Sequence, residues 1–585
     1  MFPRATLDRR LEFHTLLQRL FRRLKAEAAP IRAAAQGALV DWASLIEKDR
    51  KLWEQATRRS HKGKSVLIAT NTGGHALVTL LESVLAVSLA LRGAKVHHLL
   101  CDAALPACLQ AMWTNLKGPE DLVDRKLAER LCKHCYKTGS MVFDQLPIEH
   151  HTLGTLCDDA SKAKARQLAE TIPADQIPTY VLDGMAIGDH AKAGALRFFA
   201  RGTLENEPMG EDVLRRYFEA SLITAFAMKN LIGKHKIDAA AFHHGIYVPQ
   251  GIVGEACRAN DIHVANWVAA YRKNCFIFSH HDTYHHTLMD EPVSEWENLP
   301  FDEKQEELIV DYLKSRWSGT RDWIWFHEKP DEDVEKLIDA RGIDRSRPII
   351  GCLTNVFWDA QLHYPANAFP NMGAWLIETV RWFAGHPELQ LLIRVHPAEI
   401  RGTVPARQKA VDEIAKAFPV LPSNVHVVGP EEQVSTYAAM LLCDSAIVYG
   451  TKTGVELTSL GIPVIVAGEA WIRNKGVTTD ARSVEHYREI LGRLPFGERL
   501  DRATVRRARM YAYHFFFRRM LPLPFLVPSK SKAMYDLGID SLQQLMPGNY
   551  PGLDLICDGI LNGTPFIYPA ETLGLHDAEE VSAAA

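Results

Sequence analysis

Short apolar runs separated by helix-length segments recur along most of the chain. In the first half, runs of strand length occupy residues 65–70, 95–100, 179–182, 239–243 and 263–267. The segments between them include a long apolar stretch that ends near Leu91 and an amphipathic stretch over 213–232. Strands that alternate with helices are typical of a parallel sheet with helices on its faces. The first half therefore predicts a Rossmann-like domain.

The second half repeats this pattern. Its apolar runs lie at 348–353, 391–395, 425–428, 445–449 and 464–466. Between the halves, residues 300–347 are rich in charge and aromatic side chains and read as a connector. We therefore expect an α/β protein with two facing Rossmann-like domains and added helices at both ends. The expected units are a helical segment over 1–60, an N-terminal domain over 61–330, a C-terminal domain over 348–500 and a helical segment over 501–585.

Both terminal segments place arginine beside apolar residues. Over 9–25, leucine and phenylalanine recur at helical spacing among basic side chains. This pattern favours a helix packed on the domain behind it, with contact to an anionic membrane surface as the alternative. Over 506–519, arginines alternate with tyrosine and phenylalanine, which favours a helix buried across both domains. Base stacking and membrane contact are the alternatives for that segment.

The composition narrows the possible partners. The chain has 585 residues, too many for one hydrophobic core. Its 67 Lys and Arg against 71 Asp and Glu give a net charge of −4, so we expect no nucleic-acid partner. The first residues lack a signal-peptide pattern, and no run of about 20 apolar residues without charge occurs. We expect a cytoplasmic protein, with any membrane contact peripheral and at the inner face.

Polar residues follow two strands of the second half. Arg394-Val395-His396-Pro397 ends one strand, and Gly450-Thr451-Lys452-Thr453-Gly454-Val455-Glu456 follows another. Ligands of open α/β sheets bind at the carboxyl ends of strands, and a polar turn that opens a helix offers backbone N–H groups to phosphate. The pair predicts a nucleotide pocket in which Arg394 and His396 donate to phosphate and Glu456 accepts from a ribose hydroxyl. A tight turn without a ligand is the alternative.

Histidines follow two strands of the first half. Asn71-Thr72-Gly73-Gly74-His75 comes directly after the first strand, where Gly73 and Gly74 would allow close approach of an acceptor. His75 is a candidate general base, and so is His243 or His244 after a later strand, because these strand ends share one edge. A further group predicts acceptor binding, a metal site or an exposed loop, and consists of His280, His281, His285 and His286.

Cysteines gather in one part of the first half. Cys132 and Cys135 form a C-x2-C pair, and Cys101 and Cys108 precede it. Four thiolates are a suitable ligand set for a structural zinc ion. Reduced, partly buried thiols are the alternative, since cytoplasmic cysteines stay reduced.

With both halves in view, the chain resembles the GT-B glycosyltransferases, and among them the bacterial capsule-polysaccharide enzymes such as the Kdo transferases. The resemblance spans roughly residues 60–560 and is carried by the two motifs above, before Gly461-Ile462-Pro463. These motifs are similar to those with which such enzymes hold a CMP-sugar. The resemblance implies transfer of a sugar from a nucleotide-activated donor to a cell-surface or lipid-linked glycan, with no cofactor required for catalysis. Similar turns occur in UDP-sugar transferases and in UDP-N-acetylglucosamine 2-epimerases, so an epimerase and a non-catalytic scaffold of glycan assembly are alternatives.

Overall fold

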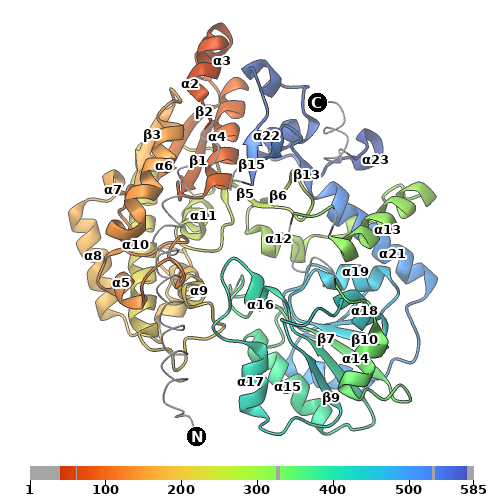
Figure 1. The fold of residues 1–585 in the computed structure, drawn as a ribbon. Helices are drawn as coiled ribbons and strands as arrows, with labels where there is room; N and C mark the ends of the chain where they lie inside the picture. The colour runs from red at the N-terminus through yellow and green to blue at the C-terminus, as the bar shows by residue number, and fades with distance from the viewer. Residues whose placement is uncertain are drawn as a thin grey trace, which may run out of the picture.

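The computed structural model describes residues 40–60, 62–319, 321–323, 330–360, 362–529 and 534–575. Two α/β domains lie side by side, with the N-terminal domain drawn from red to yellow-green and the C-terminal domain in teal (Figure 1). The helix predicted over 9–25 lies outside the described residues. No described helix combines the length and the apolar character that a membrane span requires.

The N-terminal domain is built on a seven-stranded sheet with the order β13-β6-β5-β4-β1-β2-β3. The neighbours from β3 to β5 pair in parallel, and β6 and β13 are antiparallel additions at one edge. Successive residues of β1 alternate between two cores, with Val66 and Ile68 on one face of the sheet and Leu67 and Ala69 on the other. The strands are β1 (Ser65–Asn71), β2 (Lys95–Leu100), β3 (Glu149–Thr152), β4 (Ala239–His243), β5 (His263–Ala269) and β6 (Cys275–His280).

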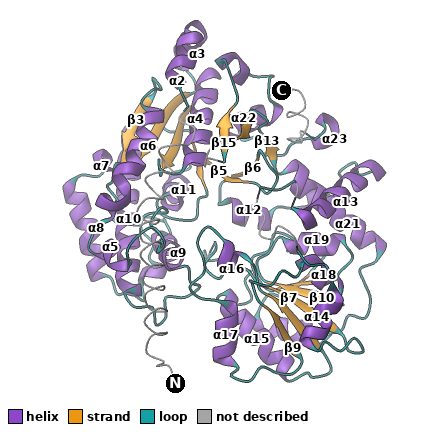
Figure 2. Ribbon diagram, in the orientation of Figure 1, coloured by secondary structure: helices purple, strands orange, loops and turns teal. Residues whose placement is uncertain are grey.

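Helices cover both faces of this sheet (Figure 2). The helix α4 is almost entirely buried, which explains why its sequence is apolar on all sides. The helices are α2 (Trp42–Lys48), α3 (Arg50–Ser60), α4 (Ala76–Leu91), α5 (Pro119–Val123), α6 (Lys133–Phe143), α7 (Leu153–Leu156), α8 (Asp159–Thr171), α9 (Ile187–Phe199), α10 (Gly210–Lys234), α11 (Gln250–Arg258) and α12 (Tyr284–Asp290). A connector with α13 (Glu303–Ser318) and α14 (Val334–Arg341) leads to the second domain.

The strand predicted at 179–182 is wrong. Residues Ile177–Thr179 form a single 3-10 turn, and Leu182 makes only an isolated bridge with Met185. Val181, in the middle of the predicted strand, is 59% exposed, so the apolar run does not mark a core position. The strands β3 and β6 were not predicted. Strand β3 has the polar sequence Glu-His-His-Thr, which gives no strand signal, whereas β6 is a buried apolar run that was overlooked.

The C-terminal domain contains a six-stranded sheet with the order β12-β11-β10-β7-β8-β9, in which every pair is parallel. Each predicted strand of this half is present within one residue at either end. The structure thus confirms an α/β protein with two Rossmann-like domains. The strands are β7 (Ile349–Leu353), β8 (Gln390–Arg394), β9 (Val425–Val428), β10 (Ser445–Val448), β11 (Val464–Val466) and β12 (Thr479–Asp480). The helices are α15 (Met372–Ala384), α16 (Ala398–Arg401), α17 (Ala410–Ala417), α18 (Thr436–Leu441), α19 (Thr453–Ser459) and α20 (Val484–Leu491).

The C-terminal segment, drawn in blue, returns from the second domain to the first (Figure 1). Helix α21 (Arg502–Tyr513) packs on α13 and α19, and the following π-helical turn, His514–Arg518, buries three phenylalanines. Helix α22 (Pro551–Asn562) then packs on β4 and β5. The segment was expected to be helical, but it also contains β13 (Leu521–Pro522), β14 (Leu526–Pro528) and β15 (Tyr535–Leu537) besides α23 (Ala570–Leu573). One continuous apolar core therefore extends from the N-terminal sheet through this segment to β10 and α19.

Candidate functional site

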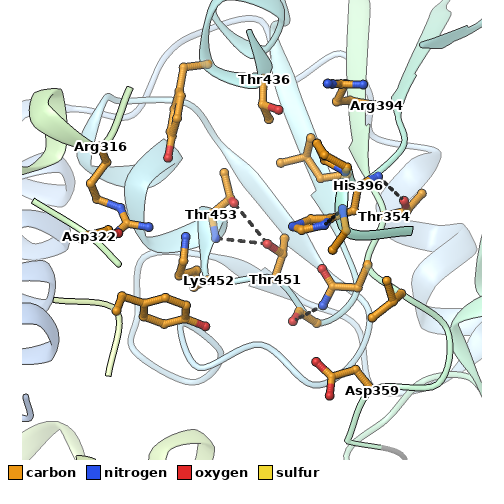
Figure 3. Close-up of a pocket in the computed structure, with 18 of the residues that line it drawn as sticks. Arg316, Asp322, Thr354, Asp359, Arg394, His396, Thr436, Thr451, Lys452 and Thr453 are labelled. Carbon is orange, nitrogen blue, oxygen red and sulfur yellow. Dashed lines mark hydrogen bonds and ion pairs between the residues drawn. The ribbon is translucent and has the colours of Figure 1, made fainter. Parts of the chain in front are cut away.

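A cavity of about 330 Å³ lies between the two domains. On one side it is lined by residues at or after the carboxyl ends of β7, β8 and β10, together with the start of α18. On the other side, α12, α13 and the segment after β5 contribute. Figure 3 shows part of the lining. The volume is within the range of small-molecule sites, and the carboxyl ends of parallel strands are where such sites form.

The two predicted motifs meet in this cavity. Arg394, His396 and Pro397 line it from one strand end, and Thr451, Lys452 and Thr453 line it from the other. Gly454 lies just behind, where a Cβ would be 3.0 Å from Ile472, so the glycine lets α19 pack closely. The expectation that the two motifs share one pocket is therefore met by the geometry.

His396 is held in one orientation by its neighbours. Its backbone N–H donates to Thr354 Oγ1 at 3.1 Å, and its Nδ1 accepts from the Ala398 N–H at 3.1 Å (Figure 3). Because Nδ1 accepts a hydrogen bond, the proton of the neutral ring is on Nε2. The ring can therefore act as a hydrogen-bond donor through Nε2.

Arg394 supports the wall of the cavity. It is 1% exposed, and its guanidinium donates to the carbonyl oxygens of Gly429 at 2.5 Å, Glu432 at 3.1 Å and Val434 at 3.2 Å. Burial lowers the pKa of Arg394 to about 10. These bonds fix the loop that carries Ser435 and Thr436, so the structure gives Arg394 a positioning role beside its place in the lining.

Lys452 lies in a buried network of charges. Its Nζ is 3.2 Å from Glu456 Oε1 and 4.7 Å from the centre of the Tyr271 ring. Glu456 Oε1 also accepts from Arg316 Nε at 3.1 Å, and Arg316 in turn pairs with Asp322. Glu456 is 2% exposed and is not among the lining residues. The structure thus places the Glu456 carboxylate behind Lys452, where it holds two cations.

The hydroxyl groups of Thr451 and Thr453 lie side by side. Thr451 Oγ1 donates to Thr453 Oγ1 at 3.1 Å and accepts from the Thr453 N–H at 3.3 Å. Asn355 Nδ2 donates to the Gly450 carbonyl at 2.6 Å and so connects this turn to the end of β7. The cavity thus brings together an ammonium group, an imidazole and several hydroxyls, which are the groups that bind phosphate.

Several lining residues could not be found from local sequence patterns. Asp359 follows β7, and Tyr247 Oη donates to its Oδ1 at 3.4 Å. Burial raises the pKa of the Asp359 carboxyl. Trp317 and Tyr437 also line the cavity and stack on each other, with ring centres 5.5 Å apart. Among the lining residues outside the two motifs, His285 was singled out by the sequence analysis, as part of a histidine-rich stretch.

His285 forms a pair with a carboxylate. Its Nε2 lies 3.2 Å from Glu469 Oε2, and Asn367 Nδ2 donates to Glu469 Oε1 at 2.8 Å. Its Nδ1 is buried and has no hydrogen-bond partner in the described part of the chain. A histidine that gives one N–H to a fixed carboxylate and keeps the other nitrogen as an acceptor has the arrangement of a general base. The other three histidines of that stretch have other partners. His280 contacts His263, the His281 ring lies near the rings of both, and His286 contacts Asp282.

His75 and His244 lie behind the cavity wall rather than in it. The His244 ring is 5.4 Å from that of Tyr284, a lining residue, and His75 is 5.4 Å from His243. Burial, and then the charge of Arg197, lower the pKa of His75 to about 4 and that of His244 to about 3. Both rings are therefore neutral at pH 7. His244 has a φ of 69°, an uncommon backbone conformation that concentrates at functional sites.

Gly73 and Gly74 pack against helix α6. A Cβ on Gly73 would lie 2.6 Å from Gly139 Cα and 2.8 Å from the Cys135 carbonyl oxygen. The Gly74 N–H donates to Cys135 Sγ at 3.1 Å. These glycines thus allow the close approach of a helix. The sequence analysis predicted the close approach of an acceptor instead.

The four predicted zinc ligands surround one small cavity. Cys101, Cys108, Cys132 and Cys135 line it together with Asn71 and Thr72. Zinc would require sulfur atoms about 3.8 Å apart, because Zn–S bonds are near 2.3 Å. These sulfurs do not form a group with all atoms within 4.8 Å of one another among the described residues. Burial also raises the pKa of the Cys108 and Cys135 thiols to about 11. Zinc at this place stays a prediction that needs the thiols to move closer.

Comparison with solved structures finds distant matches that include glycosyltransferases and a sugar-nucleotide epimerase. A chain of Thermosulfurimonas dismutans KpsC, a beta Kdo 2,4 transferase, matches with 13% identity over 47% of this chain and 79% of that chain, with a TM-score of 0.32. The UDP-GlcNAc 2-epimerase from Neisseria meningitidis matches with 10% identity over 76% and 94%, with a TM-score of 0.25. The calicheamicin glycosyltransferase CalG4 matches with 12% identity over 77% and 94%, with a TM-score of 0.23. No protein-family model matches the sequence, and no curated protein does.

The Glu456 network makes stability depend on pH. Burial disfavours the charged carboxylate, but Arg316 and then Lys452 outweigh it and lower the pKa of Glu456 from 4.5 to about 2. The contribution is therefore complete above the unfolded-state pKa and is lost as the pH falls from 4.5 towards 2. It amounts to roughly 3 kcal/mol. We expect Glu456→Gln to lower the melting temperature at pH 7, and to lower it less at pH 3.5. The exposed control Glu489→Gln should change it at neither pH. An equal deficit at both pH values would contradict the ion-pair account.

The glycine packing gives a second prediction. We expect Gly73→Ala to destabilise the protein by about 1–3 kcal/mol, the usual cost of forcing atoms into a packed site. Gly233→Ala is the matched control, because Gly233 lies in α10 with nothing within 4 Å of the added Cβ. Alanine favours a helix there, so the control should keep or raise the melting temperature. Equal melting temperatures for the two variants would show that α6 does not need Gly73.

Proposed function

We propose that this protein transfers a sugar from a nucleotide-activated donor to a hydroxyl group of a cell-surface or lipid-linked glycan. The observation that carries the proposal is the interdomain cavity in which the two phosphate-type motifs meet residues of the other domain. Such a cavity allows one domain to hold the donor while the other presents the acceptor. The resemblance of the two motifs to those of the Kdo transferases supports the same reaction class.

The charges of the cavity favour a donor with a single phosphate. The two cations of the buried network, Lys452 and Arg316, are matched by Glu456 and Asp322. Lys452 and His396 are then the main groups that face a phosphate, assisted by the hydroxyls of Thr451 and Thr453. A CMP-sugar, which has one phosphate, suits this set better than a nucleoside diphosphate sugar. The stacked rings of Trp317 and Tyr437 provide an aromatic surface for the base.

In this proposal, His285 is the general base. Its Nδ1 takes the proton of the acceptor hydroxyl while the acceptor oxygen bonds to the anomeric carbon. The bond between that carbon and the phosphate oxygen breaks, and its electron pair leaves with the nucleotide. Lys452 and His396 stabilise the departing phosphate. Glu469 stabilises the imidazolium that forms on His285. His75 and His244, which the sequence analysis predicted as the base, are the alternatives. Variants of all three histidines are compared below.

Nucleotide binding tests the donor site. We expect CMP to raise the melting temperature of the wild type more than CDP, UDP or GDP, because a ligand of the native state stabilises it by mass action. His396→Ala should weaken binding about 10- to 100-fold, since it removes a hydrogen bond to a charged group. His486→Ala, at the start of α20 in the same domain, is the matched control and should bind normally. Equal affinity of His396→Ala and the wild type would contradict the assignment of His396.

Turnover tests the base. We expect His285→Asn to lower the transfer rate by about 10²–10⁴, the usual contribution of a general base, while the affinity for the nucleotide is kept. His75→Ala and His244→Ala should lower it less. A full rate in His285→Asn, with a large loss in His244→Ala, would move the base to His244.

Incubation with donor alone separates a transferase from an epimerase, because an epimerase would convert the sugar without an acceptor. Binding of none of the four nucleotides would contradict the transferase proposal and favour the scaffold alternative.

A further inference from the structure

A second cluster of polar side chains lies at the far edge of the N-terminal sheet. His97 is on β2, Glu149 and His151 are on the edge strand β3, and His235 directly follows α10. Each side chain offers one ligand atom, and these atoms all lie within 4.8 Å of one another. None of the four residues lines the interdomain cavity. The transfer reaction therefore does not account for the cluster.

Four of the separations between these side chains are close to those of a tetrahedral shell. His97 Nδ1 is 3.0 Å from His151 Nε2, and His235 Nδ1 is 3.3 Å from Glu149 Oε1. The distances from His97 Nδ1 to Glu149 Oε2 and from His151 Nε2 to Glu149 Oε1 are 3.6 and 3.8 Å. A zinc ion with nitrogen and oxygen ligands at about 2.0–2.1 Å has ligand atoms about 3.4 Å apart. These four distances, two to Glu149 Oε1 and one to Oε2 among them, lie on both sides of this value, and no separation within the cluster exceeds 4.8 Å.

The strand register explains why these residues converge. His97 is paired with Glu149, and Leu99 with His151, so that residues 97, 149 and 151 share one face of the sheet. His98 and His150 share the opposite face, where their Nδ1 atoms are 3.3 Å apart. The end of α10 adds His235, whose ring centre is 4.8 Å from that of His151. Three separate elements thus deliver ligands to one point.

The burial of the histidines suits a metal ion. Burial lowers the pKa of His97 to about 4 and also lowers the pKa of His151. Burial thus favours the neutral form of both imidazoles, which is the form that binds metal ions. Lys95 Nζ lies 3.0 Å from Glu149 Oε2 and holds the carboxylate from the outside. Residues beyond the metal ligands often fix a carboxylate in this way.

We propose that His97, Glu149, His151 and His235 bind a divalent transition-metal ion, for which zinc is the best match to three imidazoles and one carboxylate. Four protein ligands complete a tetrahedral shell, as in structural rather than catalytic zinc sites. The ion would attach the four-residue edge strand β3 and the end of the 25-residue helix α10 to β2. It would thereby protect an edge of the sheet that otherwise depends on few backbone hydrogen bonds.

Metal analysis of the full-length chain, purified without a histidine tag, tests the proposal. We expect about one zinc ion per chain by mass spectrometry, as for a single four-ligand site. His151→Ala and His235→Ala should lose the ion. His150→Ala is the matched control, because His150 is adjacent on β3 but lies on the opposite face, and it should keep the ion. A chelator should lower the melting temperature of the wild type and of His150→Ala, and leave that of His235→Ala unchanged.

Cobalt distinguishes this site from the cysteines. Cobalt in the metal-free protein should give the spectrum of a tetrahedral nitrogen and oxygen site without thiolate charge-transfer bands. Thiolate bands, with metal retained by His151→Ala and His235→Ala, would place the ion at Cys101, Cys108, Cys132 and Cys135 and overturn the proposal. The proposal would also be overturned if the wild-type protein contains no metal and binds neither zinc nor cobalt. The histidines would then be linked only by hydrogen bonds.

Discussion

The buried ion pair between Arg316 and Glu456 holds the cavity together. Arg316 belongs to the connector helix α13, and Glu456 belongs to α19 of the C-terminal domain. The guanidinium is also about 5–6 Å from the rings of Tyr271 and Phe516, which come from the N-terminal domain and the C-terminal segment. One side chain of the connector thus contacts three other parts of the chain. A charge buried to this extent is stable only with its partners in place, so the four parts are fixed relative to one another.

This arrangement determines the chemistry of the cavity. The Glu456 carboxylate pairs with both Arg316 and Lys452. It thereby holds the ammonium group of Lys452 at the turn after β10, where Lys452 lines the cavity. The C-terminal segment supports this ion pair, because it packs on α13 and α19, the helices that carry Arg316 and Glu456, before it returns to the first domain. The hydrophobic core that runs along this path adds burial to the ion pair. The metal site proposed at the β3 edge of the N-terminal sheet would add a second link within that domain.

Local sequence patterns predicted the central strands and the meeting of the two motifs, for a simple reason. Buried parallel strands are continuous apolar runs, and their carboxyl ends gather at one edge. Most missed elements lack that signal, whereas β6 has it, because β6 is a buried apolar run that local patterns could have revealed. Strand β3 is polar, and β13 pairs with β6 although about 240 residues separate them. The missed site residues depend on partners equally remote in sequence, since Arg316 and Glu456 are 140 residues apart and His285 and Glu469 are 184 apart. No local pattern reports such a pair.

A crystal structure of the protein with a CMP-sugar or CMP tests the central claim most directly. The account predicts the phosphate within hydrogen-bond distance of Lys452 Nζ, His396 Nε2 and the hydroxyl of Thr451 or Thr453, with the base against Trp317 and Tyr437. The sugar would then face His285 across the cavity. A nucleotide bound elsewhere, for example beside Gly74 and His75 at the end of β1, with none between residues 394–397 and 450–456, would contradict it.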